Sequence, residues 1–218
     1  MTADSNDSYH HGDLAVTLMD LALARISAEG TERLSLRGLA REAGVSPAAP
    51  YRHFPSKRCL LAALATRGFR ELLSRVQAHE RLSEDLEERL LNLGRAYIGF
   101  ALDRPTTYQI MFGTIVDDFS AYADLAAAAE AAYAPVLAAM AALIERYPHW
   151  QMTPVQLGGV TWAAVHGIAS LVLFRTGSAD QSNQRLTTRS LDALQADTDA
   201  ALRLLMQGVL HPPGIVHA

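Results

Sequence analysis

Apolar residues recur along this chain at intervals of three and four positions, the spacing that gathers them on one face of an α-helix. Runs of alternating β-branched residues, which indicate strands, do not occur in the sequence. We therefore expect an all-α fold. The predicted helices cover residues 13–29, 36–43, 56–80, 83–101, 105–113, 119–147, 154–177 and 190–209.

Residues that favour helix ends mark several of these boundaries. Gly30 and Gly44 follow the first two helices, and glycine accepts the left-handed backbone conformation that is common at helix C-termini. Ser35 and Ser56 precede the second and third helices, where serine is a good N-cap. Pro135 lies inside the 119–147 helix, and its missing N–H predicts a kink or a break there.

The predicted helices fall into two regions of different size. A small three-helix unit occupies about 10–55, and the helix over 56–80 connects it to the rest of the chain. The remaining helices form a larger region over 81–211. This organisation predicts a small domain joined by a helix to a larger one.

Residues 44–57, GVSPAAPYRHFPSK, follow the second predicted helix. Two short helices joined at Gly44 form a helix-turn-helix, in which the second helix enters the DNA major groove. Ser46 and Pro47 suit the N-cap and first helical position. Pro50 cannot donate a backbone hydrogen bond, and it also restricts Ala49. We therefore expect this helix to begin irregularly, or to become regular only from Pro50 onward.

The charge distribution supports a site for a polyanion. The chain carries a net charge of −4, which by itself argues against nucleic-acid binding. Residues 33–58 nevertheless hold six basic residues against one acidic residue, Glu42. We call this stretch the cationic segment. A compact positive patch on an acidic protein is typical of a local nucleic-acid interface. Its basic residues are Arg33, Arg37, Arg41, Arg52, Lys57 and Arg58.

The single cysteine, Cys59, excludes an internal disulfide and fits a reducing compartment. No signal peptide is apparent at the N-terminus. Residues 157–174 contain no formal charge, and their length lies at the lower edge for a membrane span. They include three glycines and His166 and lack a flanking basic cluster. We expect a helix buried in the protein or in a dimer, no membrane partner, and a cytoplasmic location.

Three stretches resemble the TetR (tetracycline-repressor) family of bacterial transcription regulators. LAREAGVS at 39–46, YRHF at 51–54 and Ser56-Lys57 match its DNA-binding region, and the resemblance covers about 12–60. YHHGDL at 9–14 and the Trp162…His166-Gly167 pattern resemble the subgroup named for a Trp-His-Gly (WHG) C-terminal signature. The resemblance implies that the region over 81–211 binds an effector and forms a homodimer. It implies that helices 154–175 and 190–209 make a four-helix bundle with their two-fold mates.

The residues of the helix-turn-helix suggest distinct contacts with DNA. We expect the apolar start of the second helix, 47–50, to touch thymine methyl groups. Hydrogen-bonded base reading then falls to Arg37, at a position where the family often has a base-contacting residue. Tyr51, His53 and Lys57 can donate to phosphate, as can Ser35 or helix-start N–H groups. The predicted DNA-binding residues are Ser35, Arg37, Ser46, Pro47, Ala48, Ala49, Pro50, Tyr51, His53 and Lys57.

Aromatic and apolar residues of the larger region could line an effector cavity, although ordinary core packing explains most such residues. They are Tyr97, Phe100, Tyr108, Met111, Phe112, Tyr133, Trp162 and His166. His10 and His11 precede the first predicted helix, and adjacent residues do not readily share an ion, so we expect no metal site. No nucleophilic or acid–base constellation is visible, and we expect no enzyme activity and no cofactor.

These observations predict a sequence-specific transcription regulator. We expect a repressor that binds a palindromic operator in double-stranded DNA as a homodimer and is released by a small-molecule effector. The alternative is a helical interaction or ligand-carrier protein without regulatory DNA binding. That alternative leaves the positive charge of the cationic segment unexplained.

Overall fold

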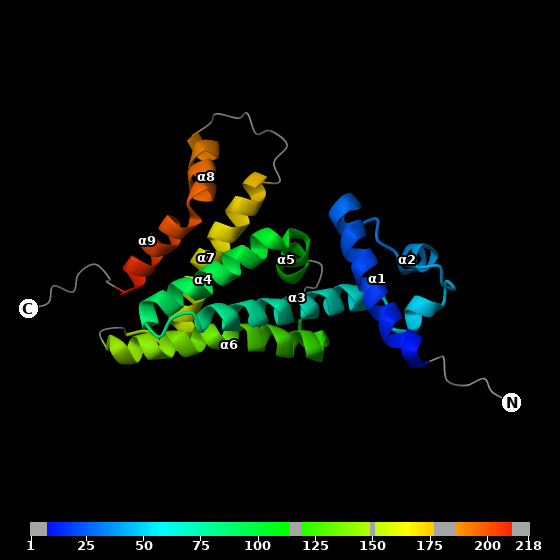
Figure 1. Ribbon diagram of the computed structural model, residues 1–218, viewed down its shortest axis with the longest axis horizontal. Coiled ribbons are helices and arrows are strands. Elements are labelled where there is room, and N and C mark those ends of the chain that lie inside the picture. The colour runs from blue at the N-terminus through cyan, green and yellow to red at the C-terminus, as the bar shows by residue number, and fades with distance from the viewer. Residues whose placement is uncertain (1–7, 114–118, 149–150, 177–185, 211–218) are drawn as a thin grey trace, which may run out of the picture. The chain divides into compact units, whose positions relative to one another are not determined.

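The computed structural model describes residues 8–113, 119–148, 151–176 and 186–210. Over these ranges the chain is helical and contains no β-strand, which confirms the predicted all-α class (Figure 1). The elements are α1 (Ser8–Glu29), α2 (Leu36–Glu42), the 3₁₀ turn η1 (Ala49–Arg52), α3 (Lys57–Glu80), α4 (Leu86–Asp103), α5 (Pro105–Phe112), the 3₁₀ turn η2 (Phe119–Ala121), α6 (Ala123–Arg146), α7 (Pro154–Thr176), α8 (Leu186–Ala196) and α9 (Thr198–Leu210).

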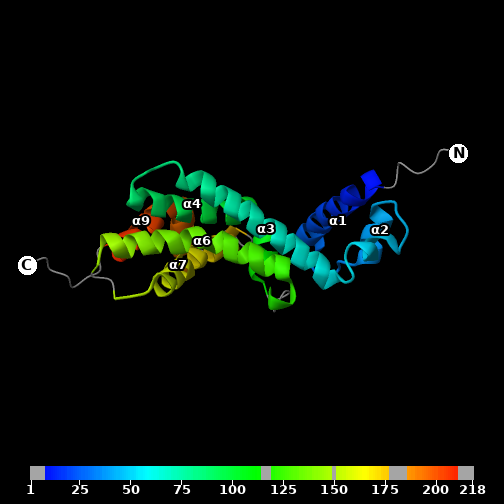
Figure 2. The same ribbon diagram turned by 90° about the horizontal axis from the view of Figure 1, so that it is seen from below.

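The chain divides into two compact units, and the residues of the long helices α3 and α6 are divided between them. Both helices can be followed along their length in Figure 2. Unit 1 comprises Met1–Phe69 and Thr106–Ala127, and unit 2 comprises Arg70–Pro105 and Ala128–Ala218. Unit 1 therefore contains α5 in addition to the N-terminal helices. The predicted domain limits at 55 and 81 stay a prediction, because the two compact units are defined by packing alone and not by function.

Unit 1 has two apolar clusters. The first includes Leu18 of α1, Leu39 of α2 and Leu60 at the start of α3, which are all fully buried. The second is aromatic. The Phe69 ring makes edge-on contacts with Phe112 and Phe119, at centroid distances of 5.5 and 5.9 Å. Buried aromatic pairs with this geometry are favourable beyond the area they bury, so α3 and α5 are firmly packed.

Unit 2 is organised around α4, which packs on both α7 and α9. Phe100 is completely buried in it. Gly94 allows α9 to approach closely, because a Cβ at this position would lie 2.6 Å from Leu202 Cδ1. Leu202 and Met206 are buried on the inward face of α9, whereas Leu204 on the opposite face is exposed.

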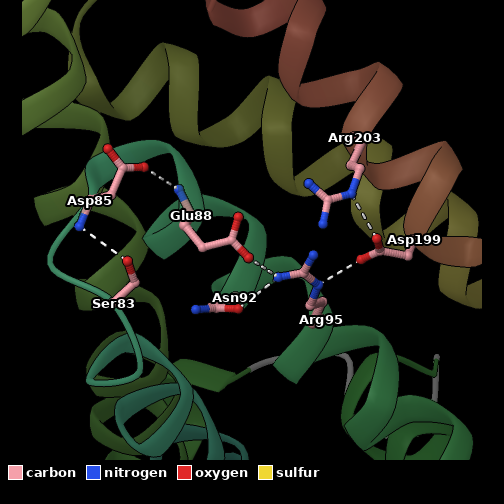
Figure 3. Close-up of polar contacts among 7 residues, drawn as sticks. All are labelled: Ser83, Asp85, Glu88, Asn92, Arg95, Asp199 and Arg203. Carbon is pink, nitrogen blue, oxygen red and sulfur yellow. Dashed lines mark hydrogen bonds and ion pairs between the residues drawn. The ribbon is translucent and has the colours of Figure 1, made fainter.

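A polar network joins the same two helices (Figure 3). Arg95 of α4 donates from Nε to Asp199 Oδ1 at 2.6 Å and from Nη1 to Glu88 and Asn92. Arg203 donates to the other oxygen of Asp199 at 2.8 Å. The hydrogen bond from Arg95 holds the pKa of Asp199 below its usual value, and the same bond raises the pKa of Arg95. The network therefore fixes the start of α9 against α4.

Most predicted boundaries are confirmed within two or three residues, with three clear exceptions. The helix predicted from residue 119 begins at Ala123, after the 3₁₀ turn η2. The first helix begins at Ser8 rather than at residue 13, so His10 and His11 lie within it. The single helix predicted over 190–209 is two helices, α8 and α9. The break follows from Asp197, whose Oδ1 accepts from the Ala200 N–H at 2.8 Å and caps a new helix start.

Two helices invite a comparison with membrane spans. The described part of the chain has α6 and α7 with the length and mean hydropathy, 1.7, of a spanning helix. Core helices of soluble proteins pass the same test, so these values are weak support for a membrane segment.

Helix α6 also runs through Pro135 as one helix, so the predicted break at this proline does not occur.

Candidate DNA-binding interface

Helix α2 is delimited by the residues expected from the sequence. The Ser35 backbone is extended, and its Oγ accepts a hydrogen bond from the Gly38 N–H at 3.1 Å. Gly44 adopts a φ of 68° just after the helix, in the left-handed region that glycine tolerates best. The N-cap and the turn glycine therefore set the length of α2 and the direction of the chain beyond it.

The segment after Gly44 is a series of tight turns. Ala49 N–H donates to Ser46 O, Tyr51 N–H to Ala48 O, and His53 N–H to Pro50 O, at 3.0 to 3.2 Å. These three-residue spacings give the 3₁₀ turn η1, with Pro50 near its start. The irregular start is confirmed, but no regular α-helix follows. The missing N–H of Pro50 and the restriction it places on Ala49 account for this.

The exposed side chains of this segment define the candidate interface. Ser46, Pro47, Ala48 and Arg52 are exposed, and Tyr51 is 44% exposed. Ala49 and His53 are half-buried. Pro50 differs from its neighbours, because it is buried against the rest of the unit. The expectation that all of 47–50 faces the groove is therefore not met at Pro50, whose ring packs inward.

The basic residues of the cationic segment lie mostly in solvent. Arg33, Arg37, Arg41 and Arg52 are exposed, and Lys57 is half-buried. Within the described ranges, none of these five has a carboxylate partner. The segment's one acid, Glu42, is instead 3.6 Å from Arg25 Nη1 of α1. The described residues consequently do not neutralise the positive charge of these five side chains, as a phosphate-binding surface requires.

Ser56 holds Lys57 at the start of α3. Its Oγ accepts from the Cys59 N–H at 3.1 Å, which is an N-cap interaction. The Ser56 hydroxyl also lies 3.2 Å from the half-buried Cys59 Sγ. The first turn of α3, which has free N–H groups and a basic side chain, thereby belongs to the same positive region.

The predicted effector residues separate into two groups. Tyr97, Tyr133, Trp162 and His166 lie together in unit 2, with Phe100 buried in the core nearby on α4. Tyr108, Met111 and Phe112 belong to α5 in unit 1, where Tyr108 and Met111 are buried. Phe100, Tyr108 and Met111 are each buried within their own unit, and their part in an effector site stays a prediction.

A hydrogen-bonded chain connects the first group. Trp162 Nε1–H donates to Tyr97 Oη at 3.3 Å, and Tyr97 Oη lies 2.8 Å from His166 Nδ1. The tyrosine hydroxyl is then available to donate to Nδ1 of a neutral imidazole. Burial lowers the pKa of His166, which favours this neutral form. The group is therefore an uncharged polar cluster with aromatic walls, including Tyr133, whose ring contacts Trp162 edge-on.

The described residues contain no group of three His, Cys, Asp or Glu side chains placed to hold a metal ion. Sequence reasoning did not single out Gly38 of α2 or Arg25 of α1, which lies against Gly38 and pairs with Glu42 at the end of α2. No local pattern marks Arg25, because its partner Glu42 lies on a different helix.

The architecture is that of a helix-turn-helix DNA-binding protein, and two family models match it. Residues 18–64 match the model described as bacterial regulatory proteins, tetR family, and residues 90–194 match a tetracyclin repressor-like C-terminal domain. Together the two matches cover more than half of the chain. The chain therefore belongs to the TetR family of DNA-binding transcription regulators. The Trp-His-Gly subgroup is named by neither model and stays a prediction.

Individual proteins agree with this assignment. The nucleoid occlusion factor SlmA of Haemophilus influenzae strain PittGG is 36% identical over 87 residues, 40% of each chain. The chain thus spans less than half the length of the curated relatives it matches. A Rhodococcus sp. RHA1 protein of unknown function is 28% identical, with a TM-score of 0.71 over 93% of this chain and 98% of that one. The TetR family regulator PfmR from Thermus thermophilus is 16% identical, with a TM-score of 0.62 over 88% and 98%, which shows a shared fold.

Membership of the family has direct consequences. TetR family regulators are soluble cytoplasmic proteins that bind DNA, usually as dimers, and they are generally not enzymes. The helix-turn-helix and all of the cationic segment lie within residues 18–64, the part of the chain that matches the tetR family model.

Proposed function

We propose that this protein is a homodimeric repressor that binds a palindromic operator and is released by a small-molecule effector. The observation that carries the proposal is the cationic segment. It displays four exposed arginines without internal carboxylate partners among the described residues, on a helix-turn-helix. A surface of this kind is electrostatically complementary to a duplex backbone.

The contacts divide between sequence reading and positioning. Arg37, exposed in the first turn of α2, reads base edges through hydrogen bonds. The exposed Pro47 and Ala48, with Ala49 beside them, touch thymine methyl groups. Pro50 serves as the packing residue that fixes their orientation. The phosphate-contacting group includes Ser35, Ser46, Tyr51, His53 and Lys57.

A second copy of the chain completes the operator-binding form. Helices α7, α8 and α9 form the interface, and α7 supplies a face that the described residues leave open to solvent. Phe174 is 71% exposed there, and Leu171 and Val160 are also exposed. Apolar residues exposed along one helix favour association. In such a dimer two helix-turn-helix units contact half-sites about 34–36 Å apart, which is why the operator is palindromic.

The uncharged cluster of Tyr97, Tyr133, Trp162 and His166 is the effector site in this proposal. Its hydrogen-bonding groups and aromatic rings suit a ligand that is largely apolar and carries a polar atom. Effector binding weakens operator binding, and by linkage the operator weakens effector binding by the same factor.

Selection of bound fragments from a random DNA pool tests the proposal. The expected result is enrichment of one sequence with two-fold symmetry and half-sites one helical turn apart. Enrichment of no sequence, together with equal affinity for all duplexes, would support the interaction or ligand-carrier alternative. The enriched duplex then serves to screen small molecules for release, measured by fluorescence anisotropy.

A further inference from the structure

We propose that Arg25 is a positioning residue for DNA binding, which holds the carboxylate of Glu42 against α1 and neutralises it. The inference rests on DNA binding through the cationic segment. It does not require a homodimer or an effector, so its test uses any duplex and leaves the rest of the proposed function aside.

The side chain of Arg25 extends from α1 toward α2. Its Nη1 is 3.6 Å from Glu42 Oε2 on α2, and its Nε is 3.7 Å from Glu29 Oε2, one turn later on α1. The Arg25 side chain is only 26% exposed, and its Nε is buried. Arg25 therefore carries the positive charge that faces both carboxylates, although it lies outside the cationic segment.

Gly38 provides the space through which Arg25 reaches Glu42. A Cβ at this position would lie 3.2 Å from Arg25 Nη1 and 2.9 Å from the Ser35 Oγ that caps the helix. Gly38 and Glu42 are four residues apart, so they lie on the same face of α2. A side chain at residue 38 would thus displace the guanidinium, the cap, or both.

Glu42 matters because it is the one carboxylate within the cationic segment. An unpaired carboxylate would oppose the approach of phosphates to Arg37, Arg41 and Arg52. With both partners more than a quarter exposed, the ion pair contributes little to folding stability. Its effect on a polyanion is larger, because the charge of Glu42 acts on several phosphates within one Debye length.

The test measures affinity for a fluorescein-labelled random duplex of about three helical turns. R25M should bind about fivefold more weakly than the natural chain at about 50 mM salt, with the difference shrinking at about 200 mM. R25K should keep most of the affinity. The double variant R25M/E42Q should return to within about twofold of the natural chain, because the one carboxylate of the cationic segment is then removed and Glu29 lies outside that segment.

The matched control is R67M, which removes the partner of Asp20 in the same unit and changes the net charge equally. It should alter affinity by less than about twofold at both salt concentrations. Equal losses for R67M and R25M would show that net charge alone matters and would overturn the proposal. Failure of E42Q to restore binding in R25M, with unchanged circular dichroism and melting temperature, would also overturn it.

A second route to the same state is G38A, which should weaken binding and be rescued in part by E42Q. If G38A binds duplex as well as the natural chain does, Gly38 is not the opening that Arg25 uses, and that step of the proposal fails. Absence of duplex binding by the natural chain would instead contradict DNA binding through the cationic segment.

Discussion

Arginine has opposite roles in the cationic segment and in unit 2. In the cationic segment, Arg33, Arg37, Arg41 and Arg52 are exposed and have no carboxylate partner among the described residues. Among the described residues of unit 2, six arginines form ion pairs, and one of them, Arg175, is 4% exposed. The six are Arg75, Arg89, Arg95, Arg104, Arg175 and Arg203.

The difference shows how one residue type serves either binding or architecture. A guanidinium paired with a carboxylate presents almost no net charge at a distance, so it attracts phosphate weakly. It can nevertheless fix the relative position of two helices through directional hydrogen bonds. An unpaired, solvated guanidinium contributes little to folding and remains available to a polyanion. The acidic overall composition is therefore compatible with DNA binding.

The largest expected effect comes from removing the unpaired charges. R37A/R41A/R52A should reduce affinity for duplex DNA by about a thousandfold at about 0.1 M salt, because up to three phosphate or base contacts are lost. The melting temperature should stay nearly unchanged, since these side chains have no described ion-pair partner. Anisotropy titration and thermal unfolding measure the two quantities. A large loss of stability would contradict the conclusion that these unpaired arginines contribute little to folding.

The converse substitution targets a paired arginine. R95M should lower the free energy of unfolding by about 1–2 kcal/mol, because Asp199, Glu88 and the buried Asn92 all lose a donor. DNA affinity measured well below the melting temperature should not change. R203M is the control, and its exposed contact with Asp199 should contribute less than about 0.5 kcal/mol. Denaturant unfolding distinguishes the outcomes, and an equal loss for R203M would show that Arg95 is not central.

Two single substitutions separate reading from positioning within the interface. R37A should relax sequence preference by about tenfold, which corresponds to about 1.4 kcal/mol. K57A should weaken specific and random duplexes alike and reduce the slope of log affinity against log salt by about one. Competition titrations with the selected operator and a scrambled duplex measure both. Identical behaviour of the two variants would contradict the distinction between base reading by Arg37 and phosphate contact by Lys57.

The smallest expected effect concerns pH and His166. Its folded pKa is lowered by burial, so the unfolded chain binds this proton more readily. The contribution to stability is complete above the unfolded pKa of about 6.5. It is lost as pH falls from there toward the folded pKa. H166Q should reduce the dependence of the melting temperature on pH in this interval, while the packing of Tyr97 and Trp162 is kept. An unchanged pH dependence would place the titrating group elsewhere.

The sequence predicted the local elements well. Ser35, Gly44 and Ser56 mark helix ends because their preferences arise from their own side chains and backbone. The same local reasoning placed the irregular segment at Pro50. It misplaced the start of α1, since Gly12 and Asp13 resemble a boundary while helix propensity is only a weak prior.

The candidate sites were predictable only in part. The positive charge of the cationic segment could be counted from the sequence. The sequence did not reveal that Glu42 pairs with Arg25 of α1 and so leaves the arginines of the segment without a carboxylate partner. The effector residues were chosen by type, and Tyr108 and Met111 belong to a different compact unit from Trp162 and His166. Side-chain type indicates what a residue can do, whereas its neighbours depend on packing between helices distant in sequence.

The amino-acid sequence by itself determined the all-α class, the capped helix-turn-helix and the family. These follow from short-range periodicity, capping and motif spacing, each set within a few residues of chain. Only the tertiary structure decided that Pro50 packs inward, that Asp199 binds an arginine on α4, and that Arg25 pairs with Glu42. Such contacts depend on how separate helices dock, and docking is governed by steric fit and burial, which have no local signature.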